Sequence, residues 1–128
     1  MEGLNALEQA VLDKFLAGDH PTLATLRAQA KNAHLLTREL SGVGFFCSFE
    51  VPPQAPRLEG LGDFQLDDVN AAVNGMAHGA GFVLFIRDGR LHMLEGFSYD
   101  EPWPAEIRQF TLTYQDEPRE LPLLPSAK

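Results

Sequence analysis

The chain is poor in cysteine and has no long apolar run. Its single cysteine, Cys47, excludes an internal disulfide framework and a cysteine-rich zinc site, and it indicates a reducing compartment. No apolar stretch approaches the length of a membrane span, and the N-terminal segment MEGLNALEQAVLDKF carries acids where a secretory signal needs basic residues. We therefore expect a cytoplasmic protein that does not enter the membrane.

Basic residues are also scarce. The chain has 10 Lys and Arg against 18 Asp and Glu, which gives a formal net charge of −8. This charge repels phosphate backbones and acidic lipid headgroups, so nucleic acid and membrane surfaces are poor partners. An acidic surface suits a basic protein partner, and that is the partner we expect.

Motifs for catalysis or metal binding are missing as well. His20, His34, His78 and His92 fall into no metal-ligand spacing with one another or with Cys47. There is no GxSxG motif and no Walker sequence, and Gly79-Ala80-Gly81 precedes a strand pattern instead of a helix. We therefore assign no catalytic residue and expect no metal and no cofactor.

The apolar spacing predicts two helices followed by a sheet. A helical stripe runs through residues 4–17, and Pro21 is well placed to begin a second helix, capped by Asp19 or His20, that reaches about Asn32. After Ala33 the apolar period changes to two, which is typical of strands. At 128 residues the chain fits one domain. It comprises a helical hairpin over about 4–32, a sheet over about 34–114 and an extended tail over 115–128.

Two glycine turns predict two β-hairpins. The turn at 41–44 pairs Arg38 with Cys47, and Asp88-Gly89 pairs Arg87 with Arg90. If pairing continues without irregularity, Leu36 meets Phe49, and Phe82 meets Glu95. We expect residues 66–73 to form an edge strand and 107–114 to form the last strand. The predicted fold is α+β, with the helical hairpin packed on a largely antiparallel sheet of five or six strands.

Glu95 and Arg38 are the two charges that these registers place on apolar faces. Glu95 shares its face with Phe82, Leu84 and other apolar side chains, and Arg38 lies between Leu36 and Leu40. A buried charge needs a partner or a shifted pKa, so the two side chains could form an ion pair or contribute to a ligand site. Alternatively, Glu95 reaches water or backbone N–H groups near the end of its strand.

A second candidate site is the loop after the last hairpin. It carries Tyr99, Asp100 and Glu101, followed by Trp103 between two prolines. An aromatic residue beside acids on a rigid loop is a reasonable contact surface for a basic partner. The alternative is that Trp103 folds back and covers the core.

Two blocks of the chain resemble a family of small uncharacterised bacterial proteins. The blocks are TRELSGVGFFCSFEVP at 37–52 and HGAGFVLFIRDGRLHMLEGFSYDEPWP at 78–104, and they cover about a third of the chain. In that family they read RE-x-x-GVGFF and GAGF-x-LF-x-x-DG-x-L-x-x-LEG, followed by WP. The resemblance implies no activity and no site residues.

These observations favour a non-enzymatic, acidic, protein-binding module of an accessory or immunity-like kind. The alternative is a small-ligand-binding protein or enzyme with a site around Glu95 and Arg38, walled by Trp103 or His92. A pocket that contains Glu95 would favour the alternative. A filled core with an exposed acidic face at 99–106 would favour the binding module.

Overall fold

The computed structural model describes residues 1–119. The elements, in chain order, are α1 (Ala6–Leu16), α2 (Pro21–Asn32), β1 (His34–Leu40), β2 (Gly44–Glu50), β3 (Phe64–Val73), β4 (Ala80–Arg87), β5 (Arg90–Ser98) and β6 (Phe110–Tyr114). The predicted α+β class is confirmed, with two N-terminal helices and a six-stranded antiparallel sheet. Most of the predicted tail, residues 120–128, lies outside the described residues.

Both helices begin at caps that the sequence encodes. Asn5 accepts a hydrogen bond from the Glu8 backbone N–H, and the Glu8 carboxylate accepts one from the Asn5 N–H, which completes a capping box. His20 caps α2 by accepting a hydrogen bond from the Thr22 N–H, and Pro21 occupies the first helical position. These starts fix which helical faces turn inward.

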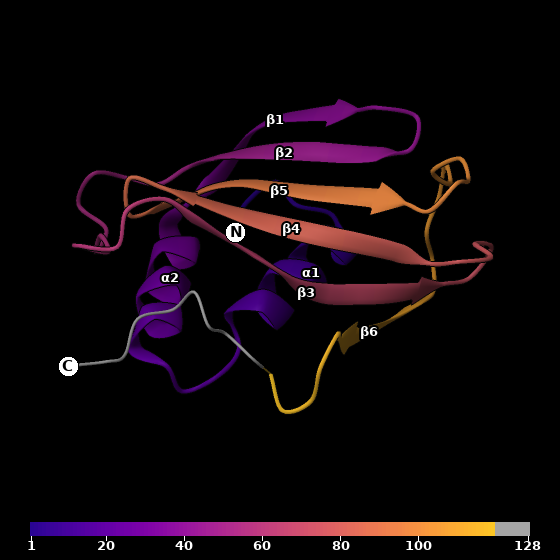
Figure 1. The fold of residues 1–128 in the computed structure, drawn as a ribbon. Helices are drawn as coiled ribbons and strands as arrows, with labels where there is room; N and C mark the ends of the chain where they lie inside the picture. The colour runs from indigo at the N-terminus through magenta and orange to yellow at the C-terminus, as the bar shows by residue number, and fades with distance from the viewer. Residues whose placement is uncertain (120–128) are drawn as a thin grey trace.

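The six strands are arranged in the order β1-β2-β5-β4-β3-β6, and both helices cover the same side of the sheet (Figure 1). The strand predicted at 66–73 is present as part of β3, but its predicted edge position is wrong. β6 pairs with β3 from Val69–Tyr114 to Val73–Phe110, so β3 has a neighbour on each side. The edges of the sheet are therefore β1 and β6.

The two predicted turns are correct, but a β-bulge in each hairpin changes the register beyond it. In the second hairpin Arg87 faces Arg90 and Ile86 faces Leu91, as predicted. Next, Phe85 faces Met93, so His92 is an extra residue of β5. In the first hairpin, Leu36 is likewise the extra residue of β1.

The bulge at His92 corrects the predicted position of Glu95. Val83, and not Phe82, faces Glu95, and Phe82 faces Gly96 instead. Because strand side chains alternate between faces, one extra residue moves all later side chains to the opposite face. Glu95 therefore lies on the side of the sheet away from the helices, and Leu94 takes its place in the core, where it is fully buried.

The core lies between the helices and the covered side of the sheet. Its fully buried side chains come from both layers and include Val11, Leu12, Phe15, Leu26, Val69, Phe82, Leu84 and Leu94. The covered side is therefore filled mainly by packed apolar groups, and a site built from residues 1–119 must lie at the rim of the core or on the other side of the sheet.

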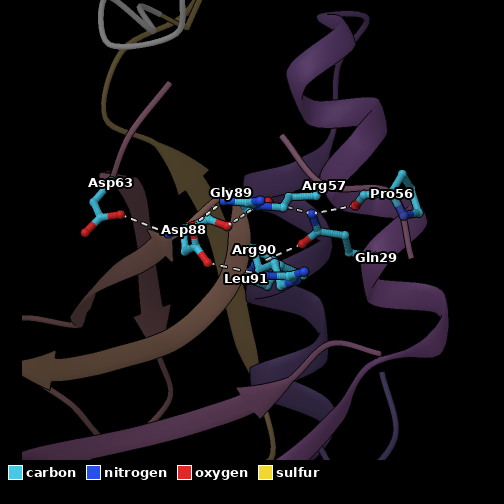
Figure 2. A network of polar contacts seen from close by, with 8 residues as sticks. All are labelled: Gln29, Pro56, Arg57, Asp63, Asp88, Gly89, Arg90 and Leu91. Atoms are coloured by element: carbon cyan, nitrogen blue, oxygen red, sulfur yellow. Dashed lines mark hydrogen bonds and ion pairs between the residues drawn. The ribbon is translucent and has the colours of Figure 1, made fainter. Parts of the chain in front are cut away.

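One buried glutamine joins α2 to the β4–β5 turn (Figure 2). The Gln29 side chain is 0% exposed, and its amide nitrogen donates to the Pro56 carbonyl at 2.9 Å and the Gly89 carbonyl at 2.8 Å. Its amide oxygen accepts from the Leu91 N–H at 2.9 Å. Gln29 thus satisfies three backbone groups from two different segments.

Surrounding polar groups hold the same turn in place (Figure 2). The Asp88 N–H donates to the Asp63 carboxylate at 2.8 Å, and Arg57 donates to the carbonyl and carboxylate oxygens of Asp88. Gly89 has φ of +73°, and a Cβ atom there would lie 2.2 Å from the Leu58 carbonyl oxygen. The turn therefore requires glycine for its conformation and for the close approach of the loop at 51–63.

Candidate functional site

Arg38 lies on the helix side of β1 and pairs with α1. Its Nε donates to Glu8 Oε2 at 2.9 Å and its Nη2 donates to Glu8 Oε1 at 2.5 Å, so the pair is bidentate. Nη2 also donates to the Gly3 carbonyl oxygen at 3.1 Å. The predicted Arg38–Glu95 pair does not form, because the bulge at His92 leaves Glu95 on the opposite side of the sheet.

Sequence reasoning did not identify Glu8 as the partner of Arg38. Its side chain is 2% exposed, although it is a carboxylate. The signals were available, because Asn5-x-x-Glu8 is a capping-box spacing and Glu8 lies three and four residues before the apolar Val11 and Leu12. The identity of its cationic partner depended on how α1 packs against β1.

The Glu8–Arg38 pair keeps both groups ionised. Burial alone would raise the pKa of Glu8, but the hydrogen bonds from Arg38 and the Asn5 N–H outweigh it, so the pKa of Glu8 is lowered. The hydrogen bond to Glu8 raises the pKa of Arg38 further above its usual range. Because the folded-state pKa of Glu8 is below its unfolded value of 4.5, this stabilisation is present above that pH and is lost as the pH falls below it.

Cys47 lies beside this pair and is fully buried. Burial, followed by the nearby Glu8 carboxylate, raises the pKa of the Cys47 thiol to about 12. The thiol is therefore protonated at neutral pH, and Cys47 acts as a small apolar side chain of the core.

A cavity of about 460 Å³ opens next to Arg38. It lies between the first turn of α1, the end of the β1–β2 hairpin and the segment 103–107. Its lining includes Leu7, Glu8, Arg38, Leu40, Phe45, Trp103 and Ile107. Two of the predicted site residues, Arg38 and Trp103, therefore share one cavity, and Glu95 does not line it.

In the loop 99–103, some side chains contact the rest of the protein and others face solvent. The Trp103 N–H donates to the Gly42 carbonyl at 2.8 Å, and the Trp103 ring packs edge-on against Phe45 at 5.6 Å between centroids. The Glu101 carboxylate accepts hydrogen bonds from the Ala77 and His78 N–H groups. These two loop residues have structural contacts.

Tyr99 and Asp100, by contrast, face solvent. The Tyr99 side chain is 42% exposed and packs edge-on against Phe97, and Asp100 is exposed. A Cβ atom at Gly81 would lie 2.5 Å from the Tyr99 hydroxyl and 2.7 Å from the Phe97 ring. Gly81 thus leaves room for the two rings to lie against the sheet.

The side of the sheet away from the helices, which we call the open face, carries apolar and acidic side chains together. Its partly exposed apolar residues are Phe46, Val83, Phe85, Met93 and Phe97. Glu39, Phe46 and Glu95 form one row across β1, β2 and β5. No helix covers this face among the residues that the structure describes (Figure 1).

We expect Glu95→Ala to change the free energy of unfolding by less than about 0.5 kcal/mol, because Glu95 is partly exposed and its side chain makes no hydrogen bond or ion pair within residues 1–119. Thermal unfolding measured by circular dichroism would check this. A loss of several degrees in the unfolding temperature would contradict the placement of Glu95 on the open face.

The other features of the described residues do not indicate a specific ligand. A larger, shallower groove of about 780 Å³ runs along the ends of β3 and β6, and its lining contains no acidic or basic residue other than His78. Within residues 1–119 no three His, Cys, Asp or Glu side chains are grouped to hold a metal ion. No helix in the described part is long and apolar enough to cross a membrane.

No model of a known protein family matches the chain, and no match is found among curated proteins or solved structures. The resemblance of blocks 37–52 and 78–104 to small bacterial proteins therefore stays a prediction.

Proposed function

We propose that this chain is a non-enzymatic cytoplasmic accessory protein, of an immunity-like kind, that binds a basic protein partner on its open face. The observation that carries the proposal is the partial exposure of Phe46 and Phe97 and the exposure of Tyr99 at one end of that face. The carboxylates of Glu39 and Glu95 lie at the same end. Partly exposed aromatic side chains surrounded by charges are typical of the centre and rim of protein interfaces.

Charge decides what kind of partner fits. Asp100 follows Tyr99 at the same end and is exposed, and the whole chain has a net charge of −8. Acidic groups around an aromatic centre attract a partner with Lys or Arg around its own apolar patch, and they repel a second copy of this chain. Arg87 and Arg90 lie at the far end of β4 and β5, which favours a basic partner contact at the end with Glu39 and Glu95.

The titratable groups near the cavity support a binding role in preference to a catalytic one. The Glu8 carboxylate is occupied by its hydrogen bonds to Asn5 and Arg38, and Cys47 is protonated at neutral pH. Neither is set up as a general base or a nucleophile.

The proposal is tested by affinity purification from the native host with the full chain as bait. We expect a basic protein that is retained at low salt and released at high salt, because rim charges govern such contacts. The double variant Glu39→Lys with Glu95→Lys should lose it. The matched control, Asp19→Lys with Glu59→Lys, makes the same charge change at exposed positions away from the open face and should retain it.

Three outcomes would contradict the proposal: recovery of no salt-sensitive partner, equal loss in both double variants, or a homodimer that the Glu39 and Glu95 substitutions abolish. Size-exclusion chromatography with light scattering distinguishes the last of these, because it reports the oligomeric state without a partner.

A further inference from the structure

We infer that the cavity beside Arg38, which lies on the other side of the sheet from the proposed partner surface, binds a small monocarboxylate with an apolar or aromatic body. The inference rests on the placement of one guanidinium next to an apolar wall in a cavity of about 460 Å³. Small-molecule sites commonly have volumes of roughly 300 to 1,000 Å³, an apolar lining and a few fixed polar groups.

The guanidinium is held in place and keeps donors for a ligand. Glu8 binds Nε and Nη2, and the Gly3 carbonyl accepts the second Nη2 hydrogen bond. Nη1 donates to no oxygen atom within residues 1–119, and the Arg38 side chain is 33% exposed. Glu8 also lines the cavity, but its side chain is only 2% exposed and both of its oxygen atoms accept hydrogen bonds from Arg38, so the guanidinium is the more accessible charge of the pair.

The remaining residues of the cavity lining favour a ligand that has an apolar body and a single negative charge. Trp103 and Phe45 form an aromatic wall, and Leu40, which is 74% exposed, lies at the rim. Arg38 is the only Lys or Arg among the described lining residues, and the exposed Glu106 pairs with Arg108 at 3.1 Å. A second negative charge on the ligand would have no cation to meet, which disfavours phosphate monoesters and dicarboxylates.

The experiment uses the fluorescence of Trp103, which is the only tryptophan of the chain and lines the cavity. Phenylacetate is titrated into the full chain at neutral pH, with its neutral amide, phenylacetamide, as the matched ligand. We expect a saturable change with phenylacetate and an apparent affinity weaker by about fivefold or more for the amide, because hydrogen bonds to a charged acceptor are stronger.

Substitution of Arg38 would leave Glu8 buried without its partner, so the test uses Leu40 at the exposed rim. Leu40→Glu should weaken phenylacetate binding and Leu40→Lys should strengthen it, each by about two- to fivefold. Leu36→Glu and Leu36→Lys are the matched controls, since Leu36 is on the same strand, is 53% exposed and does not line the cavity. They should leave the affinity unchanged.

The inference is overturned by any of three results. These are no saturable change with phenylacetate, equal affinity for phenylacetate and phenylacetamide, and equal effects of the Leu40 and Leu36 substitutions. Unchanged far-ultraviolet circular dichroism of the Leu40 variants confirms that the comparison is made between folded proteins.

Discussion

Gln29→Leu should lower the free energy of unfolding by about 3 to 5 kcal/mol, because it removes a fully buried side chain that hydrogen-bonds to three backbone groups around the β4–β5 turn. Leucine has nearly the same size, so the loss comes from the Leu91 N–H and the Pro56 carbonyl being left without a protein partner. The Gly89 carbonyl loses one of its two hydrogen bonds and keeps the one from the Leu58 N–H. Urea unfolding followed by circular dichroism measures the change.

Two further variants isolate the cause. Gln65→Leu is the control, since Gln65 is exposed on β3, and we expect it to change stability by less than about 0.5 kcal/mol. Gln29→Glu keeps an acceptor for the Leu91 N–H but places a carboxylate opposite two carbonyl oxygens. Its pKa would be raised on folding, so the stability of this variant should increase as the pH falls toward the unfolded-state pKa. A stable, pH-insensitive Gln29→Glu protein would show that water enters the turn.

Arg38→Met should lower the free energy of unfolding by about 3 kcal/mol, because it leaves the Glu8 carboxylate buried without its cation. The double variant Glu8→Gln with Arg38→Met should be more stable than Arg38→Met alone, since the buried charge is then gone. Chemical unfolding of the four proteins gives the coupling free energy as a double-mutant cycle.

The contribution of Glu8 to stability should depend on pH with opposite signs in the natural chain and in Arg38→Met. In the natural chain the lowered pKa of Glu8 makes its stabilisation disappear as the pH falls below 4.5. In Arg38→Met only burial and the helix cap remain to act on Glu8, so its pKa should rise and the protein should gain stability on acidification. Arg57→Met is the control, because Arg57 pairs with Asp88 in an exposed position and should contribute less than about 1 kcal/mol.

An additive cycle would overturn this account of Arg38. It would mean that Glu8 and Arg38 contribute independently, through the α1 cap and through packing, and that the guanidinium is not held in place by the carboxylate. The cavity would then lack the fixed donor on which its proposed ligand depends.

Local sequence signals predicted the elements well. The Asn5 and His20 caps, the apolar stripe of α1 and the two glycine turns act over a few residues, so they are readable without knowledge of the rest of the fold. The same signals predicted the residue pairs next to each turn. They could not predict the bulges at Leu36 and His92, since a bulge forms when packing beyond the hairpin favours one extra residue.

The candidate sites depended on those bulges and on long-range packing. One extra residue in β5 moved Glu95 from the core to the open face, where it joins Glu39 from a strand 50 residues or more away in the chain. Arg38 and Trp103 were both chosen from sequence, but their meeting in one cavity required the loop after β5 to return to the β1–β2 turn.

By itself, the sequence determined the α+β class, the helical hairpin, the positions of the strands and the acidic charge, because periodicity, capping and composition are local properties. Only the tertiary structure decided that Arg38 pairs with Glu8, that β6 pairs with the outer edge of β3, and that Glu95 faces away from the helices. These outcomes depend on contacts between segments far apart in the chain and on a shift of a single residue, which reverses the face of every side chain that follows it.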